Sequence, residues 1–154
     1  MELIDKLLPP VDVAYTGPQA ALYFNYLLVA WNLSRTGIHM FSDESGAVHG
    51  PGLDISGKQG LDIISLIAQF GVATMIFFLV QLAVVIRYPF LTPFLLFLSV
   101  IEHWTRFAMG KYKPLGSATN RPPPGAKLTF FFMAASPVFF LISLMESGTE
   151  IGSQ

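Results

Sequence analysis

The side chains best suited to chemistry are charged or imidazole groups that interrupt apolar segments. Glu102, His103 and Arg106 stand close together late in one such segment. Glu102 and Arg106 are four residues apart, so on a helix they can form an ion pair. This pair either neutralises two charges near the lipid headgroups or shares one partner with a substrate, a proton path or Asp62. The spacing therefore indicates a polar site and leaves both interpretations open.

Other polar residues fall at similar depth in neighbouring apolar segments. Arg35 and His39 come near the end of the first segment, and Asp62 and Gln69 come near the start of the second. Consecutive spanning helices alternate in direction, so we expect all of these residues in the same half of a membrane bundle. The predicted ligand-binding or structural polar cluster consists of Arg35, His39, Asp62, Gln69, Glu102, His103 and Arg106.

The candidate ligands of this cluster are hydrophobic molecules with a polar end. His39 and His103 are either hydrogen-bonding groups or, as a pair on two helices, ligands of a haem iron. The phenylalanine-rich runs TFFFM, PVFF, IFFLV and FLLFL either face lipid and pack, or contact a quinone, sterol, carotenoid or chlorophyll-type pigment. The sequence requires no cofactor.

Catalytic and metal-binding templates are absent from the sequence. No GxSxG, P-loop, HExxH or GxGxxG pattern occurs, and the three histidines are too scattered for a metal-ligand spacing. The absence of cysteine excludes disulfides, thiolate nucleophiles and Cys-ligated metals. Nine Lys and Arg against ten Asp and Glu, with no cationic run, argue against nucleic acid as a partner. We therefore predict no catalytic residues and no metal site.

The composition predicts the elements that position these residues. Of 154 residues, 53% are hydrophobic and only 12% are charged, whereas soluble domains carry about 25% charged residues. A spanning helix needs about 20 mostly apolar residues. We predict an all-α integral membrane four-helix bundle, a single domain over 1–154, with spans at about 18–40, 61–86, 89–109 and 126–146.

The connections and the basic residues predict the topology. Only RYP separates the second and third spans, which predicts a short antiparallel hairpin. Seven basic residues lie on the face that holds the loops after the first and third spans, against two on the opposite face: Arg35, Lys58, Arg106, Lys111, Lys113, Arg121 and Lys127 against Lys6 and Arg87. The positive-inside rule then places these loops in the cytoplasm and both termini on the non-cytoplasmic side.

A series of short motifs also resembles a known group of proteins. GIHMF, GLDISG, the Gln81-Leu82 pair, RYPFLTPFLLFLSVIEHWTRF, KPLG and PPPGA resemble uncharacterised bacterial four-helix membrane proteins of the DoxX-like kind, from about Leu27 to Leu144. The resemblance implies a bundle in the bacterial cytoplasmic (inner) membrane, with recurring acidic and arginine residues at Glu102 and Arg106. It implies no settled activity, and the N-terminal MELIDKLLPPVDVAYTG falls outside it.

These observations lead to two functional hypotheses. The first is a non-catalytic accessory or assembly subunit of a larger bacterial membrane complex, such as a bioenergetic one, in contact with membrane lipids and other subunits. The second is a protein that binds a hydrophobic or quinone-like small molecule, or haem, at the polar cluster in the cytoplasmic half of the bundle. Transport is a weaker third option, because no internal repeat provides an alternating-access pair.

Overall fold

The computed structural model describes residues 7–49, 52–114 and 124–146, and within them every regular element is helical. In chain order these are α2 (Gln19–Phe41), α3 (Lys58–Arg87), the 3-10 helix η1 (Pro89–Leu91), α4 (Thr92–Tyr112) and α5 (Pro124–Ser143). The prediction of an all-α fold with four main helices is confirmed for this part of the chain. Pro93 lies in the first turn of α4, where its missing N–H costs no helical hydrogen bond.

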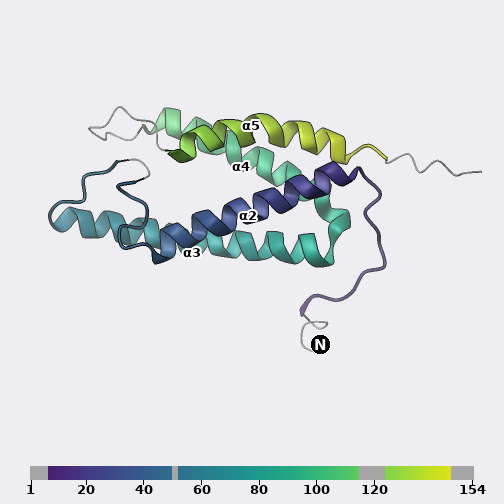
Figure 1. The fold of residues 1–154 in the computed structure, drawn as a ribbon, viewed down its shortest axis with the longest axis horizontal. Coiled ribbons are helices and arrows are strands. Elements are labelled where there is room, and N and C mark those ends of the chain that lie inside the picture. Colours follow the sequence, from purple (N-terminus) through teal and green to yellow (C-terminus); the bar gives the residue numbers. More distant parts are fainter. Residues whose placement is uncertain (1–6, 50–51, 115–123, 147–154) are drawn as a thin grey trace, which may run out of the picture.

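The helices pack as two pairs, α2 with α3 and α4 with α5, and α2 also contacts both members of the second pair (Figure 1). The α3–η1–α4 connection is short, as the RYP sequence predicts. Beyond the turn, however, α3 and α4 diverge, because α3 packs along α2 while α4 packs along α5. At the turn, Val84, Val85 and Leu95 form a small apolar cluster between the two helices.

A larger apolar core joins α2 to the second pair of helices. It is built from Ala21, Phe24, Leu28, Leu96 and Phe132, all buried. The ring of Phe24 also stacks on that of Phe139 in α5, with centroids 4.2 Å apart and planes 9° from parallel, an arrangement that aromatic pairs favour. This core fixes the crossing of α2 over α4 and α5.

The remaining interior is unusually polar, and the surface is unusually apolar. Two hydrogen bonds cross between α2 and α3: Asn32 Nδ2 donates to Gln81 Oε1 at 2.6 Å, and Thr36 Oγ1 donates to Thr74 Oγ1 at 3.1 Å. Large apolar side chains are exposed on all four main helices, including Phe41, Leu66, Ile76, Ile86, Phe94, Trp104, Phe131 and Leu141. Polar groups inside and apolar groups outside form the reverse of a water-soluble bundle.

Within the part of the chain that the structure describes, one helix, α3, is long and apolar enough by itself to cross a membrane. With a rise of about 1.5 Å per residue it extends about 45 Å, beyond a hydrocarbon core of about 30 Å. By the same test α2 and α4 do not qualify, because their interior faces carry polar and charged residues such as Asn32, Arg35, Glu102 and Arg106. A single spanning candidate is weak evidence, so the four-span prediction remains a proposal.

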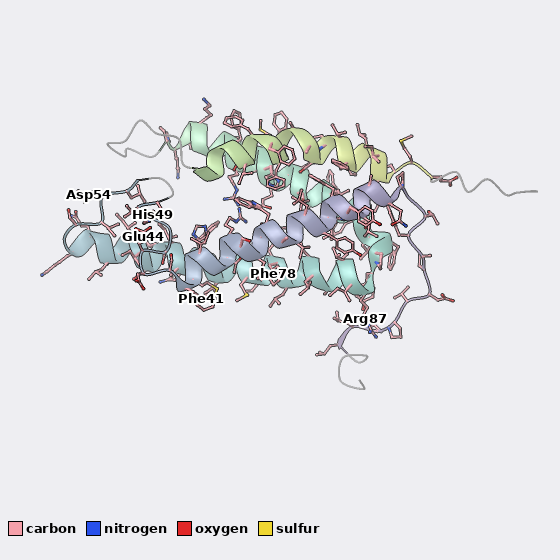
Figure 2. The ribbon with its side chains drawn as sticks, viewed as in Figure 1. Phe41, Glu44, His49, Asp54, Phe78 and Arg87 are labelled. Atoms are coloured by element: carbon pink, nitrogen blue, oxygen red, sulfur yellow. The ribbon has the colours of Figure 1, made fainter. Side chains whose placement is uncertain are left out.

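The N-terminal segment lies against the turn end of α3. Arg87 Nε donates a hydrogen bond to the carbonyl oxygen of Leu8 at 2.6 Å, and the Tyr88 hydroxyl donates to that of Pro9 at 2.9 Å. Figure 2 shows Arg87 on the side of α3 that this segment approaches. These bonds attach the N-terminal segment to the helical bundle.

The loop between α2 and α3 contains a hydrogen-bonded pair of Glu44 and His49. Figure 2 shows Glu44 and His49 side by side in this loop. The His49 ring nitrogen Nδ1 and its backbone N–H both donate hydrogen bonds to Glu44 Oε1. The hydrogen bond from the His49 side chain is the main cause that lowers the pKa of the Glu44 carboxyl. The folded-state pKa therefore lies below that of the unfolded chain.

This pair predicts an acid-sensitive loop. A carboxyl with a lowered folded-state pKa stabilises the fold above its unfolded pKa of about 4.3 and loses that contribution as the pH falls through the folded value. We expect His49→Ala to raise the pKa of Glu44 toward its ordinary value, measured by carboxyl ¹³C NMR titration. Asp54, whose pKa is lowered by hydrogen bonds from Ser56, serves as the control and should titrate unchanged. Identical Glu44 midpoints in both proteins would contradict the prediction.

Candidate functional site

Two arginines from different helices converge on one carboxylate. Arg35 Nη2 on α2 donates to Glu102 Oε1 on α4 at 3.0 Å, and Arg106 Nη2 donates to the same oxygen at 2.6 Å. The Glu102–Arg106 contact is the i,i+4 pair that the sequence suggests, and Arg35 adds a bridge between the two helical pairs. We call Arg35, Glu102 and Arg106 the Arg–Glu–Arg cluster.

This cluster is largely shielded from solvent and carries a net charge. The side chains of Arg35, Glu102 and Arg106 are 13%, 20% and 34% exposed. Two guanidinium groups and one carboxylate leave one positive charge uncompensated within the cluster. Arg106 is the most accessible member of the cluster.

Several atoms of the cluster lack a hydrogen-bond partner. Arg35 Nε, Arg106 Nε and Glu102 Oε2 are buried, and none of them has a partner among the described residues. An unsatisfied buried polar atom costs about 1–3 kcal/mol, and more when it belongs to a charged group. The cluster therefore offers two donors and one acceptor beyond the hydrogen bonds that hold it together.

An aromatic side chain of α3 completes the site. The guanidinium carbon of Arg106 lies 5.8 Å from the centre of the Phe70 ring, within the range of a cation–π contact. Phe70 also meets the edge of His39 at a centroid distance of 5.8 Å. Because Phe70 is 43% exposed, it presents an apolar surface beside the charged groups. Sequence reasoning does not identify Phe70, since one phenylalanine among 14 carries no distinguishing signal.

The two predicted histidines lie beside the cluster and bind backbone carbonyls. His103 Nδ1 donates to the carbonyl oxygen of Ser99 at 2.7 Å, and the His103 ring packs 5.4 Å from Phe132 of α5. His39 Nδ1 donates to the carbonyl oxygen of Ser45 at 3.0 Å and so ties the loop to the end of α2. A carbonyl can only accept a hydrogen bond, so each Nδ1 carries the proton. His103 is therefore a buried neighbour of Glu102, and His39 anchors the loop.

Asp62 and Gln69 are not brought into the cluster. Both side chains are exposed on α3. The face of α3 that turns inward follows Gly71, Thr74 and Gln81 instead. The 3-4 spacing of Asp62, Ser65 and Gln69 puts them on a common face, but all three residues on that face are exposed.

Thr74 and Gln81 are the interior polar residues of α3 that the predicted cluster omits. Their sequence signal is the spacing of Gly71, Thr74, Phe78 and Gln81, which places a small residue and two polar ones on one helical face. Each of the two polar residues bonds a polar residue of α2, so this face aligns the helix that carries Arg35.

The site contains no grouping typical of metal sites. Among residues 7–49, 52–114 and 124–146, no three His, Asp or Glu side chains gather closely enough to hold a metal ion. What the geometry offers is a partly buried, positively charged group of hydrogen-bonding atoms next to an exposed aromatic ring. No protein-family model, curated protein or solved structure matches this chain.

Proposed function

We propose that this chain is a multi-pass membrane protein that binds the polar end of a hydrophobic or quinone-like molecule at the Arg–Glu–Arg cluster. The main observation that supports this function is the convergence of Arg35 and Arg106 on a single oxygen of Glu102. One arginine is enough to neutralise one carboxylate, and each additional buried charge is costly in an apolar environment. Neutralisation of Glu102 therefore does not explain the second arginine, which is suited to binding an additional group from a ligand.

The membrane location rests on the distribution of side chains. Exposed apolar residues on α2, α3, α4 and α5 exceed what a soluble monomer tolerates, and they surround a hydrogen-bonded polar interior. We place the chain in a bacterial cytoplasmic membrane with four spans. The count of lysines and arginines puts the cluster in the cytoplasmic half and both termini on the opposite side.

Bound-molecule analysis tests the ligand-binding function. The tagged full chain is purified from bacterial membranes in mild detergent, extracted with organic solvent and analysed by mass spectrometry. We expect one amphipathic species at near-stoichiometric amount, reduced about tenfold in Arg35→Gln because a charge-assisted hydrogen bond is lost. Arg87→Gln is the matched control, because Arg87 lies at the turn end and bonds Leu8. Equal content in wild type, Arg35→Gln and Arg87→Gln would refute the function.

A second function, an accessory subunit of a membrane complex, is favoured by one helix face. Phe94, Phe97, Ile101 and Trp104 of α4 are each 44–54% exposed, and their 3-4-3 spacing is that of a helix-packing seam. The same purification examines this function through the proteins that accompany the chain. A stoichiometric membrane-protein partner that is lost in Trp104→Ala would support it, and migration as a free small oligomer on a native gel would contradict it.

A further inference from the structure

We propose that the group bound by the Arg–Glu–Arg cluster is the head of an anionic phospholipid, namely a singly charged phosphodiester that also carries a hydroxyl group. This inference rests on the proposed function and names its ligand class. The argument has three parts, namely the charge of the cluster, its unpartnered atoms and its surroundings.

The charge of the cluster selects a monoanion. Arg35 and Arg106 bring two positive charges to the single negative charge of Glu102. A neutral quinone head would leave the excess charge uncompensated, and a zwitterionic head would bring no net charge. A phosphodiester carries one negative charge, which matches the excess, and guanidinium groups suit its oxygen atoms.

The unpartnered atoms specify the hydrogen-bonding groups of the ligand. Arg35 Nε and Arg106 Nε are donors, so each requires an acceptor such as a phosphate oxygen. Glu102 Oε2 is an acceptor, and it requires a donor. A phosphodiester without a hydroxyl group supplies no donor, whereas a glycerol or similar substituent does. Phosphatidylglycerol combines both groups in one head.

The surroundings favour a lipid over a free phosphate ester. Arg35 lies six residues before the end of α2 at Phe41, about 9 Å along the helix axis, a depth suited to headgroups. Phe70, 43% exposed, lies under Arg106 and offers an apolar flank to an acyl chain. In the predicted orientation this end faces the cytoplasmic leaflet, where anionic lipids carry the surface charge.

The test is competitive lipid retention by the delipidated full chain, measured by native mass spectrometry. The probes have identical acyl chains: phosphatidylglycerol, phosphatidylmethanol with the same charge and no hydroxyl group, and phosphatidylcholine with no net charge. We expect wild type to retain phosphatidylglycerol about tenfold over phosphatidylcholine, with phosphatidylmethanol between them. Soluble glycerophosphoglycerol, a singly charged phosphodiester that carries hydroxyl groups, tests whether the cluster binds a lipid head or any soluble ester of the same chemistry. We expect it not to displace the lipid at equal concentration.

Variants separate a binding role from a structural one. Arg35→Gln and Arg106→Gln should each reduce retention of phosphatidylglycerol about tenfold, and Arg87→Gln should leave it unchanged. Glu102→Gln removes the negative charge of the carboxylate, which repels an anionic head. It also removes the Oε2 acceptor, which in wild type requires a hydroxyl donor from the ligand. We therefore expect it to raise retention of phosphatidylmethanol until the two anionic lipids are held equally. A purely structural carboxylate would instead weaken both.

Each contrary outcome has a defined meaning, and the wild-type comparison alone decides the proposal if a variant fails to fold. Equal retention of phosphatidylcholine and phosphatidylglycerol would contradict the proposal that the bound head is anionic. Equal retention of phosphatidylmethanol and phosphatidylglycerol by wild type would contradict the proposal that the bound head carries a hydroxyl group. Displacement of the lipid by glycerophosphoglycerol would show that the site takes a soluble phosphodiester and would overturn the lipid assignment. If wild type retains a neutral amphiphile and Arg35→Gln loses it, this inference fails while the proposed function stands. If Arg35→Gln changes the retention of no amphiphile, both fail.

Discussion

Replacing Glu102 by alanine is expected to lower the free energy of unfolding by about 3 kcal/mol, because it leaves two partly buried guanidinium groups without their shared carboxylate. Removal of one partner from a buried ion pair costs about 3–5 kcal/mol. We expect the lower end, since Arg106 is 34% exposed and water can compensate part of the loss. Thermal or denaturant unfolding in a fixed detergent measures the change.

A double-mutant cycle isolates the interaction that links the two helical pairs. Arg35→Gln and Glu102→Gln are measured singly and together, because the 3.0 Å contact between them joins α2 to α4. We expect a coupling energy of about 1–3 kcal/mol, as for other contacting residues. Additive effects would mean that the bridge between Arg35 and Glu102 does not stabilise the bundle.

The sequence predicts part of this site because helical spacing is a local property. Glu102 and Arg106 are four residues apart on one helix, so their contact follows once the helix is assigned. The choice of Arg35 as the third member depends on how α2 crosses α4, and that crossing is set by the core around Phe24 and Leu96. Depth along the membrane can be estimated from sequence, but a partner on another helix cannot.

The misplacement of Asp62 and Gln69 has a related cause. A polar stripe marks the interior only if it continues along the packed face of the helix. In α3 that face runs through Gly71 and Thr74, where α2 comes close, and it is rotated away from Gln69. The first turns of α3 extend beyond this contact, so polar residues there meet the surroundings rather than the bundle.

The second large effect is expected at Gly71, where α2 packs closely against a position of α3 that has no side chain. A Cβ atom there would lie 2.9 Å from His39 Cβ and 2.8 Å from Met40 Cγ. The methionine chain can rotate, but His39 Cβ is fixed to the backbone of α2, so the helices must separate. We expect Gly71→Ala to destabilise the protein by about 2 kcal/mol, as overpacking of a tight contact does.

Gly37→Ala provides the matched control, because a Cβ at Gly37 meets no atom within 4 Å. Both substitutions remove a helical glycine and gain about 1 kcal/mol of helix propensity, so only the interhelical contact distinguishes them. Separation at Gly71 also pulls on Thr74, whose hydroxyl donates to the Gly71 carbonyl and accepts from Thr36. Gly71→Ala should therefore unfold earlier than wild type and Gly37→Ala later. If the two variants shift together, the contact of α2 and α3 at Gly71 is not tight enough to make an added methyl group destabilising.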